Sequence, residues 1–221
     1  MKAVVFDVDG TLVDSMGFWN NLARNYLLTL EIEAQDDLNS VLETLTVREG
    51  VLYIKEEYGI DKTLETIREE MDRMIFKFYS EEAGFKPYVL ELLEILKTKG
   101  TKMAIATLTE EEFIESMLER LGAREYFEFI QTPTNSGIGK DSPDFYKLIS
   151  ERLNVLADET VFFEDSIYAM IPAKKYGMIV VGVEDQASLK DKDQIKDIAD
   201  RFIKDFSEFT GGHYEKYSNC R

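Results

Sequence analysis

The stretch FDVDGTLVDS, residues 6–15, follows an apolar run near the start of the sequence and contains two aspartates two positions apart. Alternate side chains of an extended strand point to the same side, so Asp7 and Asp9 would lie close together and repel each other. A bound cation is the first explanation for such a pair, because it compensates like charges. Gly10 and Thr11 come next and are expected to turn the chain. The stretch therefore predicts a strand that ends in a charged site.

Short apolar runs elsewhere in the chain predict a parallel β-sheet. The expected strands are residues 3–8, 102–107, 127–132, 161–165 and 178–183, with residues 201–206 as a candidate edge strand. Most of these runs are nearly continuous in Val, Ile, Phe and Ala, whereas a strand with one solvent-exposed face alternates apolar and polar residues. This pattern is typical of strands that are buried on both faces.

Helical patterns fill intervals between these strands, at residues 87–100, 109–122 and 142–154. Pro87 is expected to open the first helix. Thr109 and Glu112 have the spacing of a capping box, and Ser142 is expected to cap the third helix, with Pro143 at its first position. The alternation of strands and helices predicts an α/β fold with a doubly wound, Rossmann-like parallel sheet.

Residues 16–83 interrupt this alternation, because they contain several helical patterns and no strand-like apolar run. We expect them to form a small all-helical domain inserted into an α/β core made of residues 1–15 and 84–221. The two junctions, residues 14–17 and 82–87, are the expected hinges.

The composition of the 221-residue chain favours a folded, acidic protein. Hydrophobic residues make up 44% and aromatic residues 12%, which is enough to build a core. Lysine and arginine number 26 against 43 acidic residues, giving a net charge of −17. Such a charge argues against binding to nucleic acids or anionic membranes, because phosphate groups would be repelled. A small anionic substrate stays possible, since local lysines or a metal ion override the overall charge.

Cysteine content and hydropathy predict a cytoplasmic protein. Cys220 is the single cysteine, so no internal disulfide can form. The apolar segment within the N-terminal residues MKAVVFDV is too short, and is interrupted too early by a charged residue, to be a signal peptide. No apolar run approaches the length that a membrane-spanning helix needs.

Polar residues follow several of the predicted strands. In a parallel sheet, functional groups gather at the C-terminal ends of the strands, so these residues are expected to share one crevice. They are Asp7 and Asp9 at the end of the first strand, Thr107 at the end of the second, Lys140 in the loop before residue 142, and Glu164 with Asp165 at the end of VFFED.

Four motifs resemble those of the haloacid dehalogenase superfamily, whose members include phosphohydrolases with an aspartate nucleophile. FDVDGTLVDS resembles the first motif, and three later stretches resemble the second, third and fourth in the same order: IATLT (105–109), GKDSPDFY (139–146) and VFFEDS (161–166). The helical insertion looks like the cap of the subfamily that includes phosphoglycolate phosphatase and β-phosphoglucomutase. The resemblance extends over nearly the whole chain.

This resemblance implies a Mg²⁺-dependent phosphatase acting on a small phosphorylated metabolite. Asp7 would attack phosphorus and form an aspartyl phosphate. Asp9 would protonate the leaving oxygen and then deprotonate the hydrolytic water. Mg²⁺ would be held by Asp7, Asp165 and the backbone carbonyl of Asp9, all hard oxygen ligands, with Glu164 supporting the ion from outside or through water.

The resemblance also implies a set of residues that bind phosphate. Thr107, Leu108 and Lys140 would contact the phosphate at the reacting centre, and Lys140 would neutralise charge there. The segment LTVREG, residues 45–50, resembles a mutase region that binds the substrate's phosphate. Arg48 is therefore a candidate contact to a distal phosphate or sugar.

Each motif also has a structural interpretation when it is taken alone. Asp7 with Asp9 could form a strand-end turn, Glu164 with Asp165 a solvated loop or helix cap, and Lys140 a surface lysine. Their joint occurrence favours the site. A nucleotide-binding P-loop around Lys140 is rejected, because Thr134 replaces its first glycine and Asp141 its serine or threonine.

Three functions stay open within this fold. Asp9 favours phosphoryl transfer, because superfamily members that dehalogenate lack a general acid there. Against a phosphosugar mutase, Trp19 stands where the mutase has a histidine, and the only histidine is His213. A non-catalytic binding protein is the third candidate function. Phe18 and Trp19 are expected to pack inside the inserted domain, with an aromatic wall over the substrate as the alternative.

Overall fold

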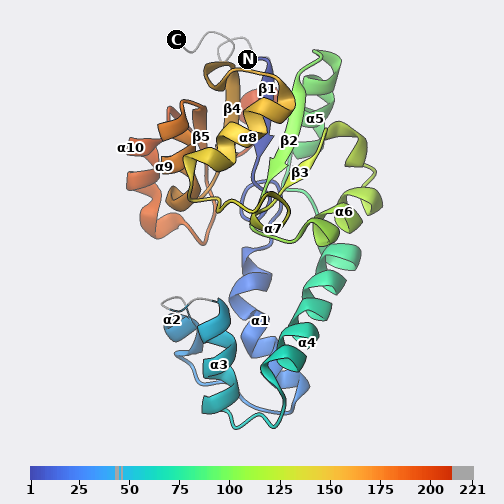
Figure 1. Ribbon diagram of the computed structural model, residues 1–221, viewed down its shortest axis with the longest axis vertical. Coiled ribbons are helices and arrows are strands. Elements are labelled where there is room, and N and C mark those ends of the chain that lie inside the picture. Colours follow the sequence, from blue (N-terminus) through green and yellow to red (C-terminus); the bar gives the residue numbers. More distant parts are fainter. Residues whose placement is uncertain (43–44, 46, 211–221) are drawn as a thin grey trace. The chain divides into compact units, whose positions relative to one another are not determined.

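A computed structural model describes residues 1–42, 45 and 47–210 of the chain (Figure 1). The chain divides into two compact units. The larger unit comprises Met1–Asp14 and the described residues from Ala83 onward, and the smaller comprises Ser15–Glu82. Each boundary lies one residue before the position expected from the sequence.

The larger unit contains a sheet of six parallel strands, which confirms the predicted α/β fold. The strand order is β3-β2-β1-β4-β5-β6. Their bounds are Ala3–Phe6 (β1), Lys102–Ala106 (β2), Ile130–Gln131 (β3), Thr160–Glu164 (β4), Ile179–Val183 (β5) and Arg201–Ile203 (β6). The candidate edge strand at 201–206 is therefore present, but only over Arg201–Ile203. β1 lies between β2 and β4, so the aspartates of the first motif follow a central strand.

Apolar side chains of the central strands pack on both faces of the sheet. On one face, Val5 and Phe162 belong to a buried cluster with residues of α8 (Pro143–Leu153) and α9 (Ile167–Tyr176). On the other face, Phe6 stacks on Phe163 with 5.2 Å between ring centroids, and Phe206 packs against both. Burying a phenylalanine side chain contributes roughly 1.5–3 kcal/mol, so these two layers hold the strands rigidly in place.

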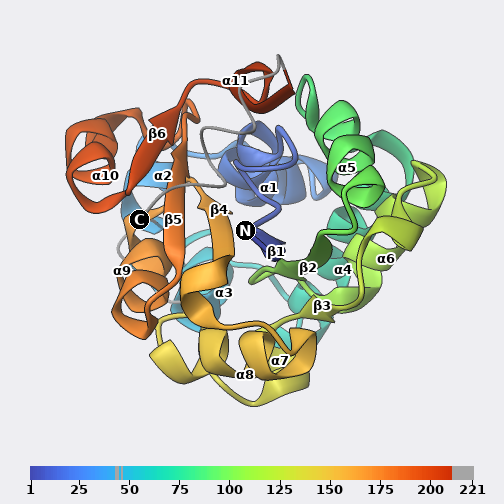
Figure 2. The same cartoon turned by 90° about the horizontal axis from the view of Figure 1, so that it is seen from above.

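Helices cover both faces of this sheet (Figure 2). α8, α9 and α10 lie on one face, and α5 and α11 lie on the other. The helices of the larger unit are Val89–Thr98 (α5), Glu111–Arg120 (α6), Pro133–Ser136 (α7), Pro143–Leu153 (α8), Ile167–Tyr176 (α9), Lys192–Ile198 (α10) and Ser207–Thr210 (α11).

The predicted start of α8 is confirmed, but the predicted starts of α5 and α6 are wrong. The Ser142 hydroxyl caps α8 by accepting a hydrogen bond from the Asp144 amide, and Pro143 is the first helical residue. Thr109 forms no capping box, because its hydroxyl donates to the Asp9 carboxylate at 2.7 Å and α6 begins only at Glu111. α5 begins after Tyr88, whose left-handed backbone prevents the helix from starting at Pro87.

β3 is shorter than the expected strand over residues 127–132. A 3₁₀ turn at Arg124–Tyr126 directly precedes this segment, and Pro133 opens α7 directly after it. β3 therefore pairs with β2 over only two residues, Ile130 and Gln131.

The smaller unit is a helical body with its own apolar core. Its helices are Met16–Thr29 (α1), Leu38–Leu42 (α2), Val47–Glu57 (α3) and Leu64–Lys77 (α4), followed by a π-helix at Phe78–Glu82. Tyr26, Leu27, Ile54 and Ile67 are among its buried residues.

Phe18 and Trp19 contact aromatic residues of the smaller unit, as expected of packing side chains. The Phe18 ring stacks on Phe78 at 4.1 Å between centroids, and the Trp19 indole nitrogen donates to the Tyr79 hydroxyl at 3.1 Å. Two further residues considered above, His213 and Cys220, lie outside the described residues. Within residues 1–42, 45 and 47–210, no helix has the length and apolar character needed to cross a membrane.

Tyr88 has a φ of 67°, which disfavours any residue with a Cβ atom, and its side chain is 49% exposed. We expect Tyr88→Gly to raise the free energy of unfolding by about 1 kcal/mol, because relief of the backbone strain exceeds the small loss of packing. Tyr88→Ala is the matched control, since it removes the ring but keeps the Cβ atom. Urea denaturation measures both variants, and a Gly variant no more stable than the Ala variant would contradict the expectation.

Candidate active site

Four of the predicted site residues come together at the C-terminal edge of the sheet: Asp7, Lys140, Glu164 and Asp165. Asp7 directly follows β1, and Glu164 is the last residue of the neighbouring β4. The register pairs Phe6 with Phe163, and the Asp7 amide donates to the Phe163 carbonyl at 3.0 Å. The carboxylates of Asp7 and Glu164 therefore extend from adjacent strand ends.

The Lys140 ammonium lies between these two carboxylates and is almost fully buried, with 3% of its side chain exposed. Its Nζ donates to Asp7 Oδ1 at 2.5 Å and lies 2.9 Å from Glu164 Oε2. The Tyr146 hydroxyl contacts the Lys140 carbonyl at 2.9 Å, which fixes the backbone of the loop that carries the lysine. A lysine this deeply buried is explained by the carboxylates around it.

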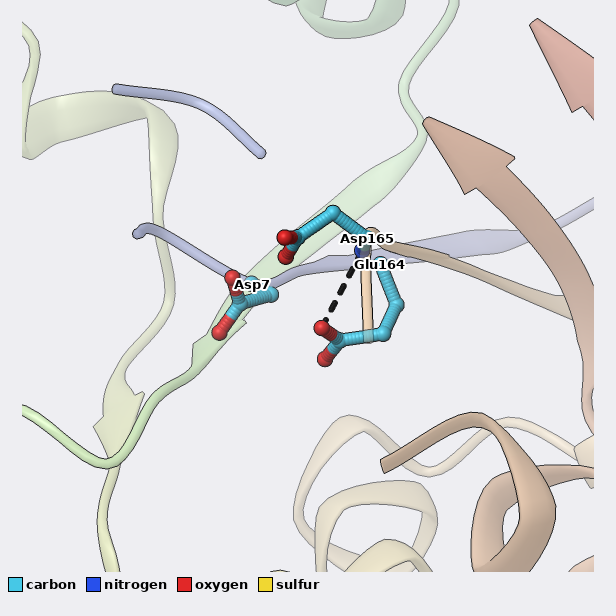
Figure 3. A group of neighbouring side chains, drawn as sticks. All are labelled: Asp7, Glu164 and Asp165. Atoms are coloured by element: carbon cyan, nitrogen blue, oxygen red, sulfur yellow. Dashed lines mark hydrogen bonds between the residues drawn. The ribbon is translucent and has the colours of Figure 1, made fainter. Parts of the chain in front are cut away.

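Asp7, Glu164 and Asp165 form a cluster that fits a divalent cation (Figure 3). Each contributes a carboxylate oxygen, and these oxygens lie within 4.8 Å of one another. Glu164 Oε1 accepts the backbone N–H groups of Asp165 and Ser166, at 3.1 and 3.0 Å, while Oε2 faces Lys140. Because the oxygens of Glu164 are engaged in this way, Asp7 and Asp165 are better placed as direct ligands of a hard cation such as Mg²⁺.

The electrostatics of the cluster also favour a cation. Burial, reinforced by the charge of Glu164, raises the pKa of Asp7 to about 8 despite the opposing effect of Lys140. Burial and the charges of Glu164 and Asp7 raise the pKa of Asp165 well above its usual range. Burial alone would lower the pKa of Lys140, but Asp7 and Glu164 raise it above its ordinary value. One ammonium does not balance three carboxylates, and a divalent ion supplies the missing positive charge.

The Asp9 carboxylate is not part of this cluster, and the expectation that one extended strand carries both Asp7 and Asp9 is wrong. β1 ends at Phe6, and the chain turns at Val8, whose carbonyl accepts from the amides of Thr11 and Val13. The Asp9 side chain is half-buried and accepts a hydrogen bond from the Thr109 hydroxyl. The two aspartates are thus held in different surroundings, although the charge of Asp9 still contributes to the raised pKa of Asp7.

The turn after Asp9 packs directly against Asp165. Gly10 has a φ of 82°, and a Cβ atom at this position would lie 2.5 Å from Asp165 Oδ2. The Thr11 hydroxyl donates to Asp165 Oδ1 at 3.3 Å. The first motif therefore holds the carboxylate of the fourth as well as supplying its own aspartates.

The segments that contribute these side chains all lie within residues 4–183, which match the family described as haloacid dehalogenase-like hydrolase. The chain belongs to this family. The match begins within β1, ends with the last residue of β5 and includes the inserted smaller unit.

Relatives of this hydrolase include phosphatases and a mutase. A phosphorylated carbohydrates phosphatase from Thermotoga maritima is 32% identical over 178 residues, which are 80% of this chain and 82% of that protein. The β-phosphoglucomutase of Bacillus subtilis is 27% identical over 197 residues, 83% of each chain. The crystal structure of a Thermotoga maritima protein provisionally assigned as a β-phosphoglucomutase superposes with a TM-score of 0.82 at 29% identity, covering 97% of this chain and 99% of that one.

The three remaining predicted residues are Thr107, Leu108 and Arg48, none of which is a carboxylate of the cluster. Thr107 is buried directly after β2, where its hydroxyl accepts a hydrogen bond from the Thr109 amide at 3.1 Å. Leu108 is 57% exposed. Arg48 is exposed on α3 of the smaller unit, and its contact with a distal phosphate stays a prediction.

Three polar residues at the same edge of the sheet were not predicted from the sequence to belong to the site: Thr109, Lys86 and Asp185. Thr109 was interpreted as a helix cap, although it directly follows the second motif. Lys86 and Asp185 form an ion pair of 2.7 Å, and Lys86 also donates to the Gly10 carbonyl. Asp185 comes two residues after β5, so its position at a strand end was the available signal. Nothing in the local sequence around Lys86 indicates this contact.

Gly10→Ala is expected to displace Asp165 and remove most of the Mg²⁺-induced rise in melting temperature, because the new methyl group would overlap the carboxylate. Gly122→Ala is the matched control: Gly122 also has a positive φ, 65°, but a Cβ atom there would meet nothing within 4 Å. The control should lower the melting temperature while keeping the Mg²⁺ shift. Thermal unfolding with Mg²⁺ or EDTA measures both, and an undiminished shift in Gly10→Ala would contradict the placement of Asp165.

The metal-free protein should lose stability as the pH rises from about 4 to about 8. Across this range the folded protein holds a proton on Asp7 that the unfolded chain has released, so unfolding becomes more favourable with each pH unit. Mg²⁺ competes with that proton, and its stabilising effect should grow over the same range.

Urea denaturation in EDTA at several pH values measures the stability of the metal-free protein. Asp7→Asn is the control, because its uncharged amide cannot titrate and its stability should fall less steeply with pH. We expect it to be more stable than the original protein at pH 8 by about 2 kcal/mol. Equal slopes for the two proteins would show that Asp7 does not carry the effect.

Proposed function

We propose that the chain is a Mg²⁺-dependent phosphatase that hydrolyses a small phosphorylated metabolite through an aspartyl-phosphate intermediate. The observation that carries this proposal is the different surroundings of two aspartates two residues apart. Asp7 is buried against Lys140 in a cation-binding cluster, whereas Asp9 is half-buried outside it and hydrogen-bonded to Thr109. Two carboxyl groups in unlike environments are suited to the separate roles of nucleophile and general acid–base.

The proposed reaction has two steps. A carboxylate oxygen of Asp7 forms a bond to phosphorus while the bond from phosphorus to the leaving oxygen breaks, and Asp9 donates a proton to that oxygen. The Asp9 carboxylate then takes a proton from a water molecule, whose oxygen attacks phosphorus and releases phosphate from Asp7. Lys140 stabilises the charge on the phosphoryl oxygens. Asp7, Asp165 and the Asp9 carbonyl would hold Mg²⁺, which when bound offsets the repulsion between the carboxylates and the phosphate.

The substrate is proposed to be a sugar phosphate or a similar phosphomonoester. The relative from Thermotoga maritima is named for phosphorylated carbohydrates. We propose that the smaller unit, Ser15–Glu82, is a cap that closes over the substrate and excludes water from the first step. Arg48 on this unit is the proposed contact to a distal group of the substrate. A location in the cytoplasm stays a prediction.

A phosphosugar mutase is the second candidate, because the chain is similar to the β-phosphoglucomutase of Bacillus subtilis. The position where the mutase carries a histidine is occupied by Trp19, whose indole nitrogen is engaged with Tyr79. This residue cannot hold or relay a proton as an imidazole does. We therefore favour hydrolysis over transfer between two positions of a sugar.

Hydrolysis of an aryl phosphate, measured with Mg²⁺ and with EDTA, tests the proposed function. We expect activity only with the metal, loss of about 1,000-fold or more in Asp7→Asn, and loss of about 100-fold in Asp9→Asn, since the first removes the nucleophile and the second the proton donor. Asp14→Asn is the control, because Asp14 is exposed and belongs to the same segment. Metal-independent turnover, or full activity in Asp7→Asn, would contradict the mechanism.

A panel of sugar, nucleotide and short organic phosphates then separates the remaining alternatives. Conversion of a hexose 1-phosphate to its 6-phosphate without release of phosphate would favour the mutase. Equal rates on phosphoproteins and small phosphates would contradict the cap, since a closing unit limits the size of the substrate. Absence of turnover on the whole panel would favour a binding protein.

A further inference from the structure

Lys86 lies in the segment that returns to the larger unit, three residues after the boundary at Ala83. This segment runs beside the end of the first motif: Val13 and Phe85 form an antiparallel bridge, and the Lys86 amide donates to the Leu12 carbonyl at 2.8 Å. The backbone of Lys86 is therefore fixed next to the turn that follows Asp9.

The Lys86 ammonium connects three parts of the larger unit. It donates to the Gly10 carbonyl and to Asp185 Oδ2, the latter at 2.7 Å, and lies 3.4 Å from the Glu184 carbonyl. Asp185 is itself held in place, because its Oδ1 accepts the Ala187 amide at 2.9 Å. Only 15% of the Lys86 side chain and 4% of the Asp185 side chain are exposed. The turn after β1 is thus tied to the loop after β5 by a buried ion pair.

We propose that the Lys86–Asp185 pair is a positioning device for the active site, acting through the Gly10 peptide. Gly10 packs against the Asp165 carboxylate, and its carbonyl accepts from Lys86. Loss of this hydrogen bond leaves the peptide between Gly10 and Thr11 held only by the bond from the Thr11 amide to the Val8 carbonyl. A shift of this peptide would displace the two groups that contact Asp165, which are the Gly10 backbone and the Thr11 hydroxyl. The inference rests on the proposed function for its effect on turnover, but its effect on the turn itself does not depend on that function.

Stability alone does not explain a pair of this kind. Burying two charges costs desolvation energy, and replacing such a pair by uncharged residues is often neutral or stabilising. A nearby pair offers a comparison: Lys192 contacts Glu184 with 30% and 24% of their side chains exposed, and Lys192 belongs to α10. The Lys86–Asp185 pair differs in being more deeply buried and in reaching the Gly10 carbonyl.

The test compares three variants of the full chain. Lys86→Met combined with Asp185→Asn removes both charges, so no unpaired charge is left buried, and the new amide still accepts from Ala187. Lys86→Arg keeps the charge and the donors. Lys192→Met is the control, because it removes the neighbouring pair without touching the turn. Circular dichroism and thermal unfolding establish that each variant is folded before it is assayed.

Turnover of the aryl phosphate gives the first readout. We expect kcat of the double variant to fall by about tenfold or more while KM changes by less than about threefold, because the reacting groups are displaced rather than the binding surface. Lys86→Arg should recover most of the lost kcat, and Lys192→Met should match the original protein. Unchanged kcat in the folded double variant would overturn the proposal.

Two further readouts do not require an active enzyme. The dissociation constant for Mn²⁺, measured by electron paramagnetic resonance, should rise by about threefold or more in the double variant. Hydrogen exchange should be faster at the amides of Gly10 and Val13 than in the original protein and in Lys192→Met. If the original protein shows no phosphatase activity, the proposed function fails, and these two measurements still decide the role of Lys86. Unchanged Mn²⁺ affinity and unchanged exchange would reject it.

Discussion

The site depends on one buried contact, in which the Lys140 ammonium lies between the carboxylates of Asp7 and Glu164. Both partners of an ion pair must give up their hydration when they are buried, and an apolar replacement is often at least as stable. The contact is therefore hard to explain as a contribution to folding. It is easily explained if the carboxylates are kept close together for a cation and the lysine offsets part of their repulsion until that cation binds.

The parallel sheet makes this arrangement possible because it fixes where each strand ends. β1 is central, and its register with β4 sets Asp7 beside Glu164 without any contribution from loop conformation. Phenylalanine rings on one face of the sheet and the cluster that includes Phe162 on the other hold these strands firmly. Charged groups that repel one another need a rigid support of this kind, because groups on a flexible loop would move apart and so relieve the repulsion.

Much of the larger unit could be predicted from the sequence, because strands buried on both faces need apolar residues at nearly every position. The motif residues Asp7, Lys140, Glu164 and Asp165 were predicted to meet because parallel strands end at one edge. What the sequence concealed was set by tertiary contacts. Thr109 has the spacing of a helix cap but binds Asp9, and Lys86 and Asp185 are ninety-nine positions apart and meet only in the folded chain.

The end of β1 at Phe6 separates the two aspartates of the first motif. Had the strand continued, Asp7 and Asp9 would have shared one face and the same surroundings. The chain instead turns at Val8, so that Asp7 is buried against Lys140 and Asp9 reaches Thr109 on the neighbouring segment. The proposed nucleophile must be ionised when it attacks, which a bound cation favours, whereas the proposed general acid must carry a proton and then release it, and one environment cannot favour both. The turn after Phe6, with Gly10 packed on Asp165, is therefore the local feature that would allow two acidic residues two positions apart to take the different roles proposed for them.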